Sequence, residues 1–373
     1  MKEPNLTAEI QFTLLGFSEV LGLQFLFFMF FLVIYMLTLL GNFLILLTVL
    51  FSPQLHSPMY YFLCELSLLD MLYSSATVPK MLTDFLTGLK VISYKGCVAQ
   101  LYAFHFFGGT ECFLLTIMAY DRYVAICDPL HYAGIMNKMA CTKLVAGTCL
   151  VGTLHSILQT VLTFHLPYCG PYQLDHYFCD VPPLLKVACA ETTLNETIVM
   201  VNIGLVALSS LTLILGSYIR IINTILKMRS EEGKKKAFST CASHLTVVIL
   251  LYGPCILIYM QPTTSHPILK GVSVFYTSVT PALNPIIYAL RNEEIKKVMR
   301  KLWSSLLTLP RKLDGRQPMG HHKSAVVSTT RSVVRRLNLL NASQMGNIDV
   351  QDTDWDQVGE RLGLVLHRFT EQN

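Results

Sequence analysis

Residues 23–50 read LQFLFFMFFLVIYMLTLLGNFLILLTVL, and no charged residue interrupts the chain between Glu19 and Glu65. A helix of about 20 apolar residues crosses the roughly 30 Å hydrocarbon core of a bilayer. Of all 373 residues, 52% are hydrophobic and only 14% are charged, whereas a soluble domain carries about 25% charged residues. The composition therefore predicts a membrane protein and excludes a disordered chain, a collagen-like fibre and a small disulfide-stapled secreted domain.

Further apolar stretches follow the first one along the chain. The full set of predicted spans lies near residues 23–50, 58–80, 97–121, 141–164, 197–219, 237–260 and 271–290. Open sheets do not span lipid, and these runs are too long and too uniformly apolar for the strands of a barrel. The sequence therefore predicts an all-α membrane protein, a bundle of seven transmembrane helices.

Lysine and arginine gather in the loops after the third, fifth and seventh spans, whereas acidic residues dilute the lysines on the other side. Positive residues favour the cytoplasmic face, so the N-terminus is predicted to be outside. The leader lacks the pattern of a signal peptide, so the first helix is expected to be an uncleaved anchor. Four regions follow: an extracellular N-terminus (1–22), the seven-transmembrane domain (23–291), an amphipathic helix on the inner membrane surface (292–307) and a disordered cytoplasmic tail (308–373).

Four of the eleven cysteines fall on the outer side of the predicted membrane: Cys97, Cys169, Cys179 and Cys189. The outside is oxidising, which favours pairing. Spacing leaves three connectivities open for four cysteines. A zinc site is disfavoured, because the chain contains no Cys-x-x-Cys pair.

Local motifs separate the classes of seven-helix protein. The third span ends in MAYDRYVAIC (118–127), the seventh in PALNPIIY (281–288), and the first two contain GN (41–42) and LSLLD (66–70). Together these motifs resemble the rhodopsin-like G-protein-coupled receptors. Three more motifs narrow the resemblance to the tetrapod-type (class II) olfactory receptors of vertebrates: LHSPMYYFL (55–63), SY (217–218) and KAFSTCASH (236–244). The resemblance runs from about residue 5 to residue 303, and these receptors usually end soon after that point.

The resemblance implies a multi-pass plasma membrane receptor that binds small volatile odorants in the outer half of the bundle. Its expected partners are a stimulatory, olfactory-type G protein that raises cyclic AMP, and membrane lipid; no nucleic acid partner is expected. No catalytic role is predicted, because the chain lacks His-Glu-x-x-His, Gly-x-Ser-x-Gly and a phosphate loop. The alternative is a small-molecule transporter, which would predict inverted repeats with broken helices in matching halves, and the sequence shows neither.

The triplet Asp121-Arg122-Tyr123 stands at the cytoplasmic end of the third span. A lone arginine at a helix end commonly anchors the helix at the membrane interface. The resemblance implies instead an activation switch, in which Asp121 restrains Arg122 at rest and Arg122 faces the G protein when the bundle opens.

Asn284, Pro285 and Tyr288 form the second part of the expected switch. Proline removes one backbone hydrogen bond and kinks a helix, and Asn284 can satisfy the freed carbonyl or reach a neighbouring helix. The resemblance implies that Tyr288 rotates inward during activation.

Asp70 and Glu111 are carboxylates expected near the middle of the membrane. Such groups should face the bundle interior and share a proton or bind a cation. The resemblance implies a sodium ion here, and the alternative is a protonated pair that serves only in packing. No other cofactor is expected.

Several residues on the third and sixth spans recur at helical spacing and so share a face. The resemblance places seven of them around the odorant cavity: Leu101, Phe104, His105, Gly108, Cys112, Tyr252 and Tyr259. Other interpretations are a close helix contact for the glycines and a hydrogen-bonded core position for the histidine.

The long second outer loop also matches the family. The resemblance implies the bridges Cys97–Cys179 and Cys169–Cys189, the first of which would pin the loop over the mouth of the cavity. The N-terminal sequon Asn5-Leu6-Thr7 lies on the outer side, so Asn5 is the expected glycosylation site.

Overall fold

The computed structural model describes residues 10–17, 20–259, 267–292 and 294–300. The chain divides into two units, residues 1–303 and residues 304–373. The second unit, and with it the predicted cytoplasmic tail, lies outside the described residues, as does the predicted glycosylation site at Asn5.

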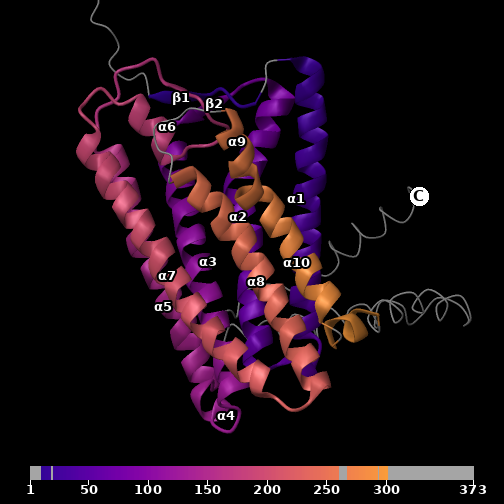
Figure 1. Ribbon diagram of the computed structural model, residues 1–373. Helices are drawn as coiled ribbons and strands as arrows, with labels where there is room; N and C mark the ends of the chain where they lie inside the picture. The colour runs from indigo at the N-terminus through magenta and orange to yellow at the C-terminus, as the bar shows by residue number, and fades with distance from the viewer. Residues whose placement is uncertain (1–9, 18–19, 260–266, 293, 301–373) are drawn as a thin grey trace, which may run out of the picture. The chain divides into compact units, whose positions relative to one another are not determined.

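Within the described residues, seven long helical segments build the membrane domain (Figure 1). They are α1 (Leu21–Leu50), α2 (Pro58–Thr87), α3 (Tyr94–Cys127), α5 (Lys138–Phe164), α7 (Thr193–Lys227), α8 (Glu231–Tyr259) and a seventh segment made of α9 (Pro267–Val274), the π-helical turn η2 (Phe275–Val279) and α10 (Thr280–Arg291). Shorter helices lie in the connections: η1 (Pro53–Leu55), α4 (Tyr132–Ile135) and α6 (Val181–Lys186). The seven-transmembrane bundle predicted from the sequence is confirmed.

The surface of the bundle is that of a membrane protein. By length and composition, α1, α3, α5, α7 and α8 are apolar enough to cross a bilayer. Large apolar side chains point outward from them; Phe25 on α1 is 65% exposed and Leu205 on α7 is 63% exposed. Extended apolar surfaces of this kind are rare on soluble monomers, whereas lipid covers them without cost.

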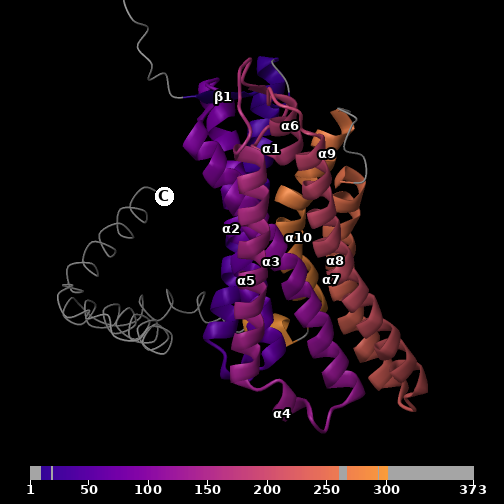
Figure 2. The same cartoon turned by 90° about the vertical axis from the view of Figure 1, so that its left-hand side faces the viewer.

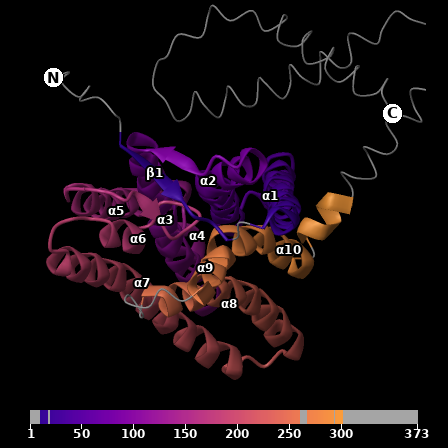
Figure 3. The same ribbon diagram turned by 90° about the horizontal axis from the view of Figure 1, so that it is seen from above.

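α3 has the most neighbours in the bundle, packing against α2, α5, α7 and α8 (Figure 3). α1 lies beside α2 and α10, and α8 lies beside α7 and α10. The short helix α4 connects α3 to α5 at the inner end of the bundle (Figure 2). α3 is therefore the helix that contributes to both cavities described below.

Several helices extend beyond the predicted spans. α3 begins at Tyr94, where the Ser93 hydroxyl accepts a hydrogen bond from the Gly96 N–H at 3.1 Å, and α8 begins at Glu231. Spans predicted from charge-free runs stop where charges begin, but a helix continues into water because its backbone hydrogen bonds do not depend on lipid.

A small three-stranded sheet covers part of the outer end, which the all-α prediction did not include. β1 (Gln11–Leu14) lies between β2 (Val91–Ser93), with which it is antiparallel, and β3 (Gln173–Leu174), with which it is parallel. Phe12 is fully buried, and the centroid of its ring lies 5.3 Å from that of the Tyr168 ring. Strands of two to four residues carry too short an alternation to be recognised in a sequence.

α3 and α5 pack closely because α5 has a glycine where they cross. A Cβ atom on Gly152 would lie 2.2 Å from the Thr110 hydroxyl and 2.9 Å from the Phe106 carbonyl oxygen. We expect Gly152→Ala to destabilise the protein by about 1–3 kcal/mol, because the added methyl group forces two helices apart. Thermal unfolding of purified protein measures this effect.

Gly147→Ala is the matched control on the same helix, since nothing lies within 4 Å of a Cβ atom there. This substitution should leave stability unchanged or raise it slightly, because alanine favours helix over glycine by about 1 kcal/mol. Equal unfolding temperatures for the two variants would contradict the close α3–α5 contact.

Candidate functional site

A cavity of about 70 Å³ lies in the outer half of the bundle, lined by residues of α2, α3, α5, α7 and α8. It is smaller than the roughly 300–1,000 Å³ of typical small-molecule pockets, so its occupant must be small or must widen it. Five of the predicted ligand-contact residues line it: Phe104, His105, Gly108, Cys112 and Tyr252.

The structure separates the other two predicted contacts from this group. Leu101 is fully buried but packs in the outer hydrophobic cluster with Phe12 and Cys97, away from the cavity lining. Tyr259 ends α8, and its side chain lies outside the described part of the chain.

Sequence reasoning missed much of the cavity wall. Further lining residues are Tyr73, Gly109, His155, Ile203, Val206, Ala207, Leu251 and Cys255. Cys255 could have been found from its spacing of three from Tyr252. The residues on α2, α5 and α7 carried no such signal, because spacing relates positions within one helix only.

The hydroxyl of Tyr252 is already engaged by the protein. It lies 2.6 Å from the Ser210 hydroxyl on α7 and donates to the Cys112 carbonyl of α3 at 3.4 Å. Tyr252 therefore shapes the cavity with its ring while its hydroxyl joins α8 to α3 and α7.

His105 gives the cavity lining a polar side chain, and Asp180 of the second outer loop lies beside it. His105 is buried, and its Nε2 atom has no hydrogen-bond partner among the described residues, although Asp180 Oδ1 lies 3.9 Å away. Burial raises the pKa of the Asp180 carboxyl to about 6, which the hydrogen bond from the Val181 N–H at 2.8 Å partly opposes. This part of the lining can therefore form a hydrogen bond with a guest.

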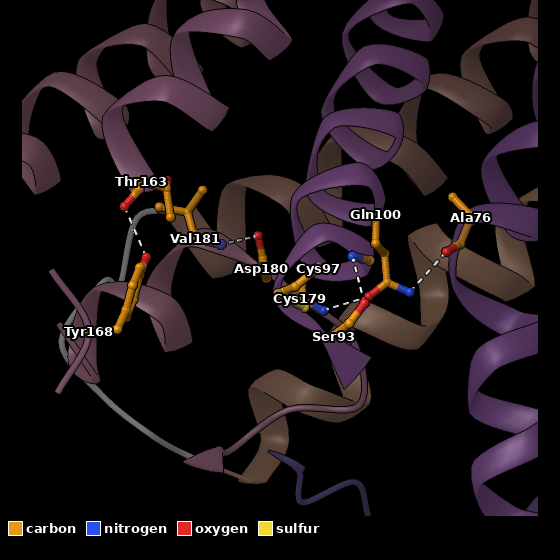
Figure 4. The surroundings of a disulfide bond; sticks show 10 residues. Ala76, Ser93, Cys97, Gln100, Thr163, Tyr168, Cys179, Asp180 and Val181 are labelled. Carbon is orange, nitrogen blue, oxygen red and sulfur yellow. Dashed lines mark hydrogen bonds between the residues drawn. A yellow bond between two sulfur atoms is a disulfide. The ribbon is translucent and has the colours of Figure 1, made fainter. Parts of the chain in front are cut away.

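A disulfide bridge holds the second outer loop to the outer end of α3. Both bridges that the resemblance implied, Cys97–Cys179 and Cys169–Cys189, are present. Next to the first bridge, Gln100 accepts a hydrogen bond from the Cys179 N–H and donates one to the Ala76 carbonyl of α2, each at 2.9 Å (Figure 4).

The loop residues that follow the sheet pack into the outer end of the bundle. The Tyr177 hydroxyl lies 2.9 Å from that of Thr277 and 3.1 Å from that of Ser273, which ties the loop to the seventh segment. Burial, with a smaller contribution from Lys270, lowers the pKa of His176 to about 3, so this side chain is neutral. The loop is therefore held by neutral hydrogen bonds and ring contacts, together with an ion pair between Asp175 and Lys270 of α9.

The two membrane carboxylates are both buried. Asp70 accepts two hydrogen bonds from the Asn284 amide, at 2.9 and 3.0 Å, which joins α2 to α10. Glu111 is 1% exposed, and neither of its carboxyl oxygens has a hydrogen-bond partner in the described residues. A buried carboxyl without a partner is costly, so these oxygens suit a bound cation or a proton.

A second cavity, of about 790 Å³, opens at the inner end of the bundle. Arg122 lines it and donates from Nη1 to the Thr240 carbonyl of α8 at 3.0 Å. The Asp121 carboxylate accepts from the Tyr132 hydroxyl of α4 at 2.8 Å, and no ion pair joins it to Arg122 in the described structure. The Thr240 carbonyl is thus the described partner of Arg122, and the restraint by Asp121 stays a prediction.

The structure also describes a buried histidine of α8 and two further residues of the predicted switch, Tyr288 and Tyr123. His244 on α8 bridges the Leu115 carbonyl at 3.0 Å and the Tyr218 hydroxyl at 2.9 Å. Tyr288 lines the inner cavity, and its hydroxyl has no hydrogen-bond partner within the described ranges. Tyr123 is half-buried and packs its ring 6.1 Å from that of Tyr120.

A family model described as olfactory receptor matches residues 31–305. Human olfactory receptor 10G7 is 52% identical over 299 residues, which cover 80% of this chain and 96% of its own. Human olfactory receptor 10G2 is 52% identical over 303 residues (81% and 98%), and mouse olfactory receptor 4E2 is 52% identical over 298 residues (80% and 96%). This chain belongs to the olfactory receptor family.

The receptor is thus a rhodopsin-like, multi-pass plasma membrane protein for odorant ligands, has a G protein as its partner, and is not an enzyme. Nothing observed favours the transporter alternative. The structure also explains two motifs of the receptor: the Asn42 amide donates to the Pro281 carbonyl at 3.0 Å, and a Cβ on Gly41 would lie 2.9 Å from Pro285. The first helix therefore packs directly against the proline-containing helix α10.

Proposed function

We propose that this receptor binds a small volatile odorant in the outer cavity and then activates a stimulatory, olfactory-type G protein that raises cyclic AMP. The observation that supports this proposal is the position of Arg122. Its side chain lines the inner cavity, and its guanidinium donates a hydrogen bond to the Thr240 carbonyl of α8. The outer and inner cavities share α3 and α8, so a movement of α8 changes both.

The inner cavity opens further only if α8 leaves α3. Three hydrogen bonds join α8 to α3. Arg122 of α3 donates to the Thr240 carbonyl of α8, and the side chains of His244 and Tyr252 on α8 bond to the Leu115 and Cys112 carbonyls of α3. The two bonds between neutral groups contribute about 0.5–1.5 kcal/mol each, and the bond from the charged Arg122 contributes about 1.5–3 kcal/mol. An odorant shifts this balance only by its difference in affinity for the closed and open arrangements.

The ligand affinity follows from the lining of the outer cavity, which is mainly apolar. Burial contributes about 25 cal/mol per Å², and a small odorant has little area to bury. Binding should therefore be weak, in the micromolar range by order of magnitude, with discrimination coming from a few polar contacts.

The carboxylates of Asp70 and Glu111 hold a sodium ion when the bundle is closed. The unpaired carboxyl oxygens of Glu111 support this role, as does the hydrogen bonding of Asp70 to Asn284, which adjoins the kink at Pro285. A bound cation compensates the buried negative charge and keeps α2, α3 and α10 together.

Raising sodium should therefore lower basal signalling, and Asp70→Asn should remove that sensitivity because one carboxylate is lost. Basal cyclic AMP is measured in sodium-containing and choline-substituted buffer. Glu65→Gln removes a carboxyl group from the same helix and should keep the response to sodium. Sensitivity that survives in Asp70→Asn would favour the protonated pair.

The inner end of the receptor also contacts lipid. Residues 294–300 are helical, with Ile295 and Val298 buried and with Lys297 and Arg300 exposed. Ile295 and Val298 pack into the hydrophobic core of the bundle, so the exposed basic residues are the ones left to meet lipid headgroups at the inner membrane surface. This segment forms the start of the amphipathic helix expected over residues 292–307.

A cyclic AMP reporter screen against an odorant panel tests the proposed function. Cells expressing the receptor should respond to a subset of odorants only when the olfactory-type G protein is present. Responses that do not depend on that G protein would contradict the proposed coupling. Uptake of labelled odorant without any response would favour the transporter.

A further inference from the structure

A second histidine lines the outer cavity, and the sequence did not indicate it. His155 on α5 is 7% exposed, and its ring centroid lies 5.5 Å from that of His105. Its Nδ1 atom lies 2.6 Å from Asn202 Oδ1 on α7. Its Nε2 atom has no hydrogen bond in the described structure, so this nitrogen is available to a ligand.

A chain of hydrogen bonds decides which nitrogen of His155 carries the proton. It begins at the Val199 backbone carbonyl, which can only accept, and which lies 3.5 Å from Gln159 Nε2. The same amide nitrogen donates to Asn202 Oδ1 at 2.9 Å. Asn202 therefore presents its oxygen, and not its amino group, to the His155 ring.

Since Asn202 Oδ1 accepts, His155 Nδ1 must donate, and the neutral ring then carries a lone pair on Nε2. A Cβ atom on Gly109 would lie 3.2 Å from His155 Cδ2 and 3.7 Å from His155 Cγ, so this edge of the ring faces α3. Gly109 itself lines the cavity. Nε2 is bonded to Cδ2 and points away from Asn202, and His155 itself lines the cavity, so we place the Nε2 lone pair toward the ligand.

We propose that His155 Nε2 accepts a hydrogen bond from a ligand hydroxyl, so that the receptor selects alcohols over ketones and ethers of the same shape. The inference rests on the proposed function, because it assumes that the odorant occupies the outer cavity. A ketone would set its oxygen against the lone pair and leave both acceptors unmet. A site built to hydrogen-bond a hydroxyl rejects analogues that lack it. Asn202 and Gln159 act as positioning residues.

The test uses matched probes: 1-phenylethanol with acetophenone, cyclohexanol with cyclohexanone, 2-heptanol with 2-heptanone, and the methyl ether of each alcohol. In the cyclic AMP assay, the half-maximal concentration of each alcohol should be at least about tenfold lower than that of its ketone and its ether, as expected from an unmet buried acceptor. His155→Phe should remove this preference while ketone potency stays within about threefold, since the ring shape is kept.

The positioning residues provide a readout that a packing role would not give. Asn202→Leu removes the acceptor of the Nδ1 proton, and Gln159→Met removes the amide that fixes the orientation of Asn202. In both variants the proton is no longer held on Nδ1, so the ratio of alcohol to ketone potency should fall. Ser156→Ala is the matched control: its hydroxyl joins α5 to the Tyr102 carbonyl of α3 at 2.5 Å, outside this hydrogen-bond chain. Ser156→Ala should leave the ratio unchanged, whatever it does to both potencies together.

Two results would overturn the inference alone: a wild-type receptor that responds to ketones as well as to alcohols, or a His155→Phe variant that keeps the preference. A different result contradicts the proposed function itself, and the inference falls with it. That result is the absence of any odorant response from surface-expressed receptor with the olfactory-type G protein present.

Discussion

Replacing Arg122 with alanine should abolish the odorant-dependent rise of cyclic AMP while the receptor still reaches the cell surface. Arg122 lines the inner cavity and is not part of the outer one, so its loss removes the proposed G-protein contact and leaves the proposed ligand site intact. The hydrogen bond to the Thr240 carbonyl is lost as well, at a cost of about 1.5–3 kcal/mol for a charged donor. That loss favours the open arrangement, so a silent variant means lost coupling and not a more firmly closed bundle.

The control is Arg220→Ala, which removes an exposed arginine from α7 that does not line the inner cavity. Responses are compared at equal surface expression, measured by antibody labelling of unpermeabilised cells. Arg220→Ala should signal normally. Normal signalling by Arg122→Ala would contradict the assignment of the inner cavity to the G protein.

Replacing Cys97 with serine should nearly eliminate folded receptor at the surface. The Cys97–Cys179 bridge spans 82 residues and ties the loop to the start of α3, next to the hydrogen bonds of Gln100. In the chain-entropy model a loop of that length contributes about 4.5 kcal/mol, against about 3.3 kcal/mol for the Cys169–Cys189 bridge. Ligand-independent surface labelling measures the loss.

Cys169→Ser should have the smaller effect, since its bridge to Cys189 spans only 20 residues. Cys149→Ser removes a free thiol from α5 and should leave surface expression unchanged. If Cys97→Ser expressed as well as Cys149→Ser, the second outer loop would not depend on its bridge for folding.

Much of the fold could be predicted, because the bilayer leaves helices as the main option for apolar runs. A single apolar run such as residues 23–50 can cross lipid only as a helix. The lysines and arginines of the loops then predict which end of the bundle faces the cytoplasm. Where water replaces lipid this constraint ends. The outer sheet around Phe12 and the polar start of α8 at Glu231 were therefore missed.

The candidate site was predicted only within single helices. Spacing along α3 placed Phe104, His105 and Gly108 on one face correctly, but it could not tell that Leu101 lies above the cavity, in the outer cluster. His155 comes from another helix, and only the packing of α5 against α3 brings it to the cavity.

The partners of polar groups were equally hidden in the sequence. The pairing of the Tyr252 hydroxyl with Ser210, and of Asp121 with Tyr132, depends on contacts between separate helices. One sequence without tertiary coordinates cannot supply such contacts. The carboxyl pair of Asp70 and Glu111 was recognised because any acid at membrane depth is exceptional.

The central claim is that an odorant in the outer cavity moves α8 away from α3 at the inner end. The most direct measurement is the distance between spin labels on unnatural amino acids at Lys138, on α5, and Glu231, at the start of α8, both of which are exposed. Purified receptor in lipid nanodiscs is measured with and without an agonist from the screen. The distance should lengthen with agonist and should not lengthen with an inactive analogue of the same size. An unchanged distance at saturating agonist would contradict the account.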